Sequence, residues 1–153
     1  MHEVKIELRF ITPCLGNVRG KVDRMQRNSD GQVIFLQTWW RGALTYAAKA
    51  MSKYIDSISK IQWDPVIRGE TTIFKRFYSN TSFKSHEAFD AGSHIFVNAM
   101  LPNEILVDDF KELLHIAGTY VGISPYGWKK DYGRFEVVSV DSRHRNINEN
   151  KNT

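Results

Sequence analysis

Apolar residues occupy every second position of the first predicted element, residues 3–11. These apolar positions are Val4, Ile6, Leu8 and Phe10. A period of two sends one row of side chains into a core and the other into water, so this segment predicts a half-buried β-strand. Pro13 ends the strand, because proline has no N–H to donate to the next ladder hydrogen bond.

Two later segments carry apolar residues at the spacing of an amphipathic helix. The first helix is expected over residues 39–59, with Thr38 as its N-cap, because a hydroxyl at that position accepts a backbone N–H. The second is expected to begin at Asp108 or Asp109, which fit the same capping role, and to stop at Gly122. Each helix has one apolar stripe and must pack against another layer.

Several shorter apolar-rich segments are predicted strands. They cover residues 32–37, 60–67, 71–78, 94–101 and 135–140. Arg68-Gly69 is interpreted as a hairpin turn, and the polar stretch 80–92 as a loop. Without the extra strands the order is βαββαβ. This order predicts an α+β, ferredoxin-like fold, an antiparallel sheet with two helices on one face, together with an extra β-hairpin or flap.

The chain has 153 residues, enough for one domain with a proper core. We expect a single ferredoxin-like domain over residues 1–141 and a flexible, asparagine-rich polar tail over residues 142–153. The lone Cys14 cannot form an intrachain disulfide, which favours a reducing, cytoplasmic compartment. No apolar run approaches the length of a membrane span, so no membrane partner is expected.

Basic residues are unevenly distributed along this chain, whose formal net charge is +4. The long connection over residues 15–31, called the basic flap below, carries Arg19, Lys21, Arg24 and Arg27. Smaller basic clusters lie at Lys75, Arg76, Lys129, Lys130 and Arg134. Such clusters suit a polyanionic partner better than a scattered surface would.

A glycine-rich segment between the second helix and the last strand interleaves aromatic and basic residues. It contains Gly122, Tyr126, Gly127, Trp128, Lys129, Lys130, Tyr132, Gly133 and Arg134. Glycine allows a backbone to approach a ligand closely, aromatic rings stack on bases, and cations bind phosphates. The combination is typical of surfaces that bind single-stranded nucleic acid.

The start of the first helix offers two more candidates. Trp39 and Trp40 are adjacent, so one is expected in the core and the other as an exposed stacking platform. Arg41 lies near the positive end of the helix dipole, where either a bound phosphate or a neighbouring acid would compensate it. The candidate nucleic-acid-binding residues are therefore Arg19, Lys21, Arg24, Arg27, Trp39, Arg41, Tyr126, Trp128, Lys129, Lys130 and Arg134.

No residue pattern predicts catalysis. The histidines are not spaced as metal ligands, and one cysteine cannot build a zinc site, so neither a metal nor a cofactor is expected. The chain contains neither a nucleophile elbow nor a Walker loop. His86, beside Glu87 in the predicted polar loop, is the best candidate for a general acid or base, although a solvated histidine is the default there.

Two stretches give the chain a resemblance to a known family. TPCLG is followed by WWRGALTYAAKA at the first helix, and the glycine-rich segment closes on YGRFEVV before the last strand. This arrangement resembles the RAMP superfamily, the ferredoxin-like RNA-binding subunits of CRISPR effector complexes. The AGTYVGI and YGRFEV runs also resemble small, uncharacterised proteins of tailed bacteriophages.

The resemblance implies a RAMP-like or RRM-like fold. It assigns Gly122, Gly127 and Gly133 to the family's glycine-rich loop, Arg41 and Gly42 to its helix start, and the basic flap to a segment that touches nucleic acid. The phage likeness implies a phage-encoded protein that works in the cytoplasm of a bacterial host.

Three functions follow as hypotheses. The preferred one is a non-catalytic protein that binds single-stranded DNA or RNA and self-associates as a homo-oligomer. The second is a phage protein-interaction module, either an inhibitor of a host factor or a structural protein. The third is a RAMP-like, metal-independent endoribonuclease, in which His86 or His94 would have to serve as the catalytic residue.

Overall fold

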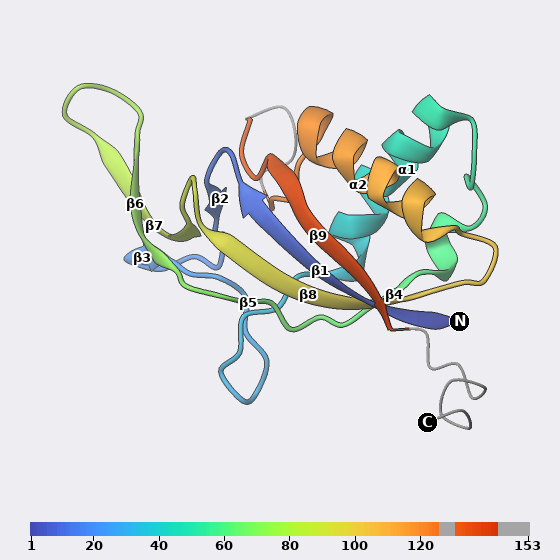
Figure 1. The fold of residues 1–153 in the computed structure, drawn as a ribbon. Helices are drawn as coiled ribbons and strands as arrows, with labels where there is room; N and C mark the ends of the chain where they lie inside the picture. The colour runs from blue at the N-terminus through green and yellow to red at the C-terminus, as the bar shows by residue number, and fades with distance from the viewer. Residues whose placement is uncertain (126–130, 144–153) are drawn as a thin grey trace.

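The computed structural model describes residues 1–125 and 131–143. It contains a main sheet covered by two helices and a smaller sheet at one end (Figure 1). The main sheet consists of β1 (His2–Phe10), β4 (Gln62–Trp63), β5 (Arg68–Gly69), β8 (His94–Leu101) and β9 (Phe135–Arg143). The helices are α1 (Gln37–Met51) and α2 (Val107–Tyr120), with a single 3₁₀ turn, η1 (Ile58–Lys60), after α1.

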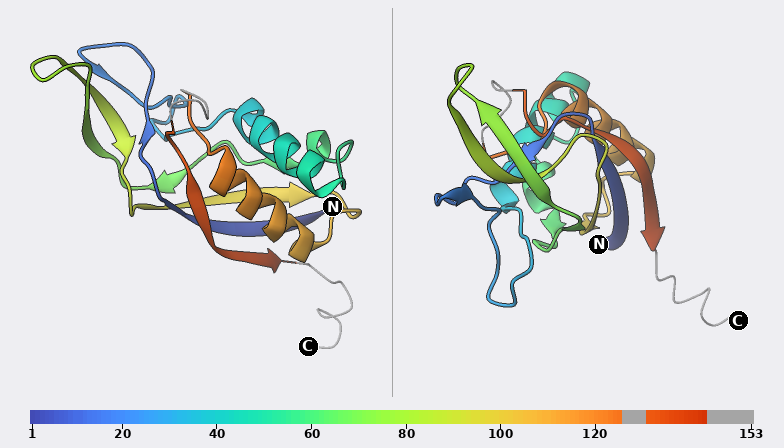
Figure 2. Two further views of the ribbon diagram at one scale, coloured as in Figure 1. Left: turned by 90° about the horizontal axis from the view of Figure 1, so that it is seen from above. Right: turned by 90° about the vertical axis from the view of Figure 1, so that its left-hand side faces the viewer.

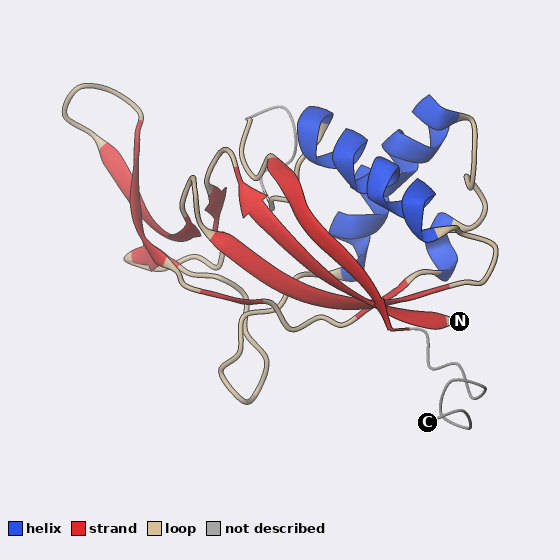
Figure 3. Cartoon of the chain, in the orientation of Figure 1, coloured by secondary structure: helices blue, strands red, loops and turns tan. Residues whose placement is uncertain are grey.

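The main sheet has the strand order of a ferredoxin-like fold. Its order is β4-β8-β1-β9, with β5 also paired to β8, and every pairing is antiparallel. The last strand therefore lies beside the first, and both helices cover the same face of the sheet (Figure 3). The predicted α+β, ferredoxin-like fold is confirmed.

The core lies between the main sheet and the helices. Every second residue of β1 is buried there, as the alternation predicted. The ring centroids of Trp40 on α1 and Trp63 on β4 lie 4.1 Å apart with the rings nearly parallel, which joins the helix layer to the edge of the sheet. Neither helix of the described chain is long and apolar enough to cross a bilayer.

Both helices differ from the prediction at their ends. The first begins at Gln37 with Leu36 as N-cap, so Thr38 lies inside the helix and the predicted hydroxyl cap is wrong. It ends at Met51, earlier than predicted, because Ser52 adopts a left-handed conformation with φ of 54°. The second helix begins at Val107, which places the two aspartates in its first turn rather than at its cap.

The smaller sheet is built around a strand that the sequence did not predict. Its central strand is β7 (Phe83–Phe89), which pairs with β6 (Thr72–Phe77), β2 (Cys14–Leu15) and, in parallel, β3 (Val22–Asp23). The predicted loop over residues 80–92 is therefore wrong. Its polar residues belong to a strand, and two of their side chains bond to distant parts of the chain. Glu87 accepts the Met25 amide, and His86 contacts the Gly16 carbonyl.

The predicted hairpin turn is also wrong. Arg68-Gly69 is strand β5, paired with Phe96 and Ile95 of β8. The turn lies instead after β6, where the Tyr78 amide donates to the Ser82 carbonyl at 2.9 Å. The predicted strand over residues 32–37 forms only isolated bridges before α1 begins.

The hairpin of β6 and β7, residues 72–89, is called the hairpin arm below. It projects beyond the end of the main sheet in Figure 1 and in the left view of Figure 2. An additional hairpin was expected, but at other residues. The last strand, β9, continues to Arg143, past the domain boundary expected at residue 141.

Candidate nucleic-acid interface

The hairpin arm exposes aromatic and basic side chains together. Phe77 and Tyr78 are each 61% exposed, and Phe83, paired with Phe77 across the hairpin, is 47% exposed. The ammonium of Lys75 lies 4.8 Å from the Phe83 ring centroid, and the guanidinium of Arg76 lies 4.6 Å from that of Tyr78. Large aromatic rings this accessible, two of them in contact with a cation, are typical of a binding surface.

The basic flap lies alongside the arm, because β2 and β3 both pair with β7. Lys84 on β7 donates to the Gly20 carbonyl at 2.5 Å and pairs with Asp23 at 3.2 Å. Three flap residues, Arg19, Lys21 and Arg24, are exposed and form no ion pair with any described residue. The flap thus adds three uncompensated positive charges beside the arm.

Arg27, the fourth basic residue predicted here, already forms an ion pair within the protein. Its guanidinium binds both carboxylate oxygens of Glu87, whose side chain is 5% exposed. The carboxylate also accepts the Met25 amide and the Thr71 hydroxyl. The Arg27 hydrogen bonds lower the pKa of Glu87 to about 2, and Glu87 in turn raises the pKa of Arg27.

His86 is fully buried at the base of the arm, not solvated in a loop as the sequence suggested. Its Nδ1 lies 2.7 Å from the Gly16 carbonyl oxygen, and its Nε2 accepts the Nε–H of Arg76 at 3.2 Å. The carboxylate of Asp23 lies 3.9 Å from Nδ1. This burial prevents His86 from reaching a substrate.

Only part of the glycine-rich segment belongs to the described chain. The predicted binding residues Tyr126, Trp128, Lys129 and Lys130 lie outside the described residues. Gly133 has a φ of +76° and its amide donates to the Pro13 carbonyl. Tyr132 contacts Phe74 of the arm, with ring centroids 6.4 Å apart. The end of the segment therefore lies beside the arm.

Arg134, the last of the predicted binding residues, forms an ion pair with Asp131 at 3.2 Å.

Trp39 belongs to a different surface. Trp40 is the core residue of the pair, whereas Trp39 is half-buried against Phe35, with ring centroids 5.4 Å apart. Trp39 lines a groove of about 580 Å³ between α1 and the end of α2, together with Gly42, Ala43, Tyr46, Tyr120, Val121, Gly122 and Ser124. Arg41 is exposed on α1 and forms no ion pair with a described residue.

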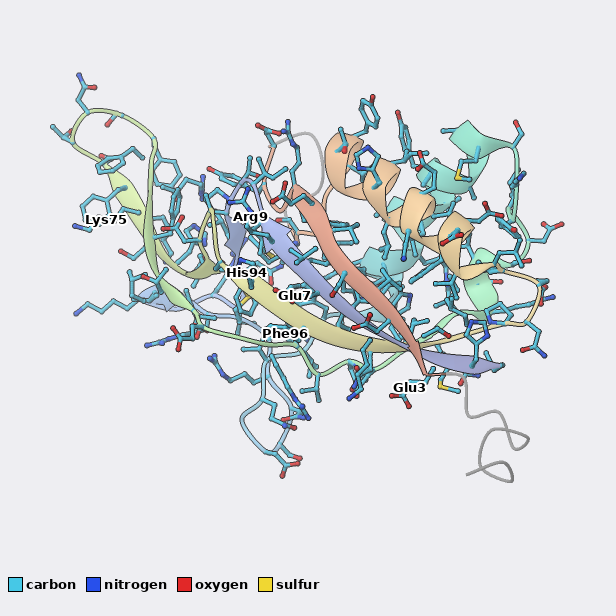
Figure 4. The ribbon with its side chains drawn as sticks, viewed as in Figure 1. Glu3, Glu7, Arg9, Lys75, His94 and Phe96 are labelled. Atoms are coloured by element: carbon cyan, nitrogen blue, oxygen red, sulfur yellow. The ribbon has the colours of Figure 1, made fainter. Side chains whose placement is uncertain are left out.

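The helix-free face of the main sheet is mixed in charge. Figure 4 shows Glu3, Glu7 and Phe96 along this face, with Arg9 and His94 nearer the arm that carries Lys75. Two ion pairs occupy it, His94 with Glu7 at 2.6 Å and Arg9 with Glu136 at 2.5 Å. A hollow on this face of about 300 Å³ is lined by three carboxylates, Glu7, Asp64 and Asp141, and two bases, Lys5 and Arg68. This face therefore lacks the surplus of positive charge that flap and arm have.

The sequence did not single out the aromatic residues of the arm. Phe77 and Tyr78 directly follow Lys75 and Arg76 in the sequence, but the polar run of β7 hid the hairpin that presents them. The structure brings together the flap, the arm and the end of the glycine-rich segment. It leaves Trp39 on the helix layer.

Comparison with known proteins supports the fold. The chain matches no family model and no curated protein. It is similar to a chain in the cryo-EM structure of the Type III-B Cmr-beta complex bound to cognate target RNA, with a TM-score of 0.59 and 8% sequence identity. The match covers 92% of this chain and 60% of the other, so this chain spans less than two thirds of its length. At this identity the likeness shows the fold alone, and it is consistent with the RAMP-like fold expected from the sequence.

Proposed function

We propose that this protein binds single-stranded nucleic acid along the surface formed by the basic flap and the hairpin arm. The observation that carries the proposal is the tip of the arm. There the rings of Phe77, Tyr78 and Phe83 are exposed, and the cations of Lys75 and Arg76 lie against Phe83 and Tyr78. The flap extends the positive charge from this tip along the side of the arm.

Each component suits an unpaired strand. Aromatic rings offer stacking surfaces that accept any base, but only when the base is not already stacked in a duplex. Cations beside the rings bind the phosphates that connect successive bases. The rigid β-ladder beneath them holds rings and cations at fixed spacing, which lowers the entropy cost of binding.

RNA is the first nucleic acid to test, because the similar chain comes from a complex bound to target RNA. Binding without catalysis is favoured over the endoribonuclease hypothesis. His86 is fully buried, and His94 pairs with Glu7 on the mixed-charge face of the main sheet. Self-association, also expected from the sequence, stays a prediction that sedimentation with and without an oligonucleotide would test.

The protein-interaction hypothesis makes a different prediction for the same surface. Exposed aromatic residues and arginine also occur in protein interfaces, so the arm alone does not distinguish the two. Binding of a protein partner would not require an unpaired strand, and it would not depend on salt in proportion to the number of phosphates contacted.

The test is fluorescence anisotropy with labelled single-stranded RNA, single-stranded DNA and duplex RNA at two salt concentrations. The double variant F77A/F83A should weaken single-strand binding roughly 5-fold or more, because each stacked base contributes about 1–3 kcal/mol. The control Y46A removes an equally exposed ring from α1 and should leave binding unchanged. If all strands bind F77A/F83A as tightly as wild type, the arm is not the site.

A further inference from the structure

Three residues connect the buried base of the arm to its exposed tip. Buried His86 accepts the Nε–H of Arg76 at 3.2 Å. The Nη2 of Arg76 donates to the hydroxyl of Tyr78 at 3.0 Å, and the same guanidinium covers one face of the Tyr78 ring at 4.6 Å. A long, flexible arginine is thereby held at both ends of its guanidinium.

The orientation of His86 is itself fixed. Its Nδ1 lies 2.7 Å from the Gly16 carbonyl, which can only accept, so Nδ1 must carry the hydrogen. Nε2 is then the lone-pair nitrogen, and it faces the Nε–H of Arg76. The flap carbonyl therefore selects the tautomer that binds the arginine.

The result at the tip is an ordered stacking surface. Arg76 covers one side of the Tyr78 ring, yet Tyr78 remains 61% exposed. A base that stacks on the open side would form a three-layer arrangement of base, tyrosine and guanidinium. The positive charge behind the ring would also attract the phosphate attached to that base.

We infer that His86 is a positioning residue that holds Arg76 and Tyr78 as a subsite for one unpaired nucleobase and its phosphate. This inference rests on the proposed function and deepens it. Its energetic basis is preorganisation, since an arginine and a tyrosine already fixed in place lose less freedom when the strand binds.

A purely structural role for His86 is the competing explanation, in which it only fastens the flap to the arm through Gly16. Two substitutions separate the roles. H86N retains a donor at the position of Nδ1 for the Gly16 carbonyl but loses the acceptor for Arg76. H86Q carries an acceptor near the position of Nε2 but loses the donor for Gly16.

The experiment measures Kd for a labelled, uridine-rich single-stranded RNA together with thermal unfolding of each variant. A positioning role predicts that H86N binds at least about 5-fold more weakly, whereas H86Q stays within about 2-fold of wild type despite its lower stability. A structural role predicts that affinity follows stability, so that H86Q binds no better than H86N. That result would overturn the inference.

A double-mutant cycle on the surface of the arm keeps the test valid should a His86 variant fail to fold. R76K keeps the charge but loses the planar guanidinium that donates to His86 and Tyr78 at the same time. We expect R76K to weaken binding about 5-fold in the wild-type background and to have almost no further effect in Y78A. Equal effects in both backgrounds would overturn the inference.

The controls distinguish failure of the inference from failure of the proposed function. K49Q removes an exposed charge from the far end of α1 and should bind like wild type. Wild-type protein that binds no single strand at either salt concentration would overturn the proposed function and the subsite with it. Wild-type binding that R76K and H86N leave unchanged would overturn the subsite alone.

Discussion

Arg27 and Glu87 lie 60 positions apart in sequence and form a two-armed ion pair, with Nη1 donating to Oε1 at 2.6 Å and Nη2 donating to Oε2. This pair fastens the basic flap to the base of the hairpin arm. Because Glu87 is almost completely buried, its charge depends on the arginine and on the two further donors that surround it.

The first prediction concerns acid stability. The folded pKa of Glu87 is about 2, below its ordinary value of 4.5, so the folded state favours the ionised form. Its contribution is fully present above about pH 4.5 and is lost as the pH falls toward about 2. We expect E87Q to be less stable than wild type by about 3 kcal/mol at pH 6 and to approach wild type near pH 2.

Urea unfolding of both proteins between pH 2 and pH 6 measures this convergence. Other carboxylates titrate in the same range, so the informative quantity is the difference between the two proteins at each pH. A difference that stays constant over the whole range would show that Glu87 is not ionised by its partners in the folded state.

The second prediction compares two helical glycines. A Cβ on Gly118 of α2 would lie 2.3 Å from the Phe135 carbonyl oxygen, whereas a Cβ on Gly42 of α1 would meet nothing within 4 Å. G42A should therefore stabilise the protein by about 0.5–1 kcal/mol through helix propensity. G118A should destabilise it by about 2 kcal/mol or more, because α2 must move away from β9. Thermal unfolding of both variants shows whether each change raises or lowers stability. A change in the same direction for both variants would contradict the packing described.

The third prediction concerns the aromatic stack between α1 and β4. Trp63 is 5% exposed and stacks on Trp40 with an interplanar angle of 4°. W63A should cost about 3–5 kcal/mol of unfolding free energy, the usual cost of deleting a large buried ring. A cost below about 1 kcal/mol in urea unfolding would mean that the edge of the main sheet is not anchored by this contact.

The order of the main elements was predictable because each carries its own local signal. The alternation of β1 and the helical spacing of α2 depend only on neighbouring residues, and the βαββαβ order follows from them. The positive charge of the flap was equally visible, since Arg19, Lys21 and Arg24 lie close together in sequence.

Strand β7 was not predictable, because its polar residues find their partners far away in the chain. His86 bonds to Gly16, 70 positions distant, and Glu87 bonds to Arg27. Without those partners the run KSHE has the composition of a loop, and the aromatic tip of the arm cannot be recognised as part of a hairpin. The 60 positions between Arg27 and Glu87 likewise hid the ion pair that Arg27 forms.

The fourth prediction tests the flap by its charge. The triple variant R19Q/K21Q/R24Q should weaken single-strand binding and reduce the slope of log K against log salt by about 2, since each phosphate contact contributes about 0.7. The matched control K49Q/K53Q/K111Q removes three exposed lysines from the helix layer and the turn after it. It carries the same net charge as the flap variant, so an equal change in slope for both would show that only the overall charge matters.

Photocrosslinking would locate the bound strand on the surface of the unaltered protein and so test whether it lies on the flap and the arm. Wild-type protein would be irradiated with single-stranded RNA containing 4-thiouridine, and the crosslinked peptides would be identified by mass spectrometry. We predict crosslinks concentrated in residues 15–31 and 72–89, with Tyr78 among the modified residues. Crosslinks confined to the open face of the main sheet or to the helix layer, or none above the level given by duplex RNA, would show that the strand does not bind on the flap and the arm.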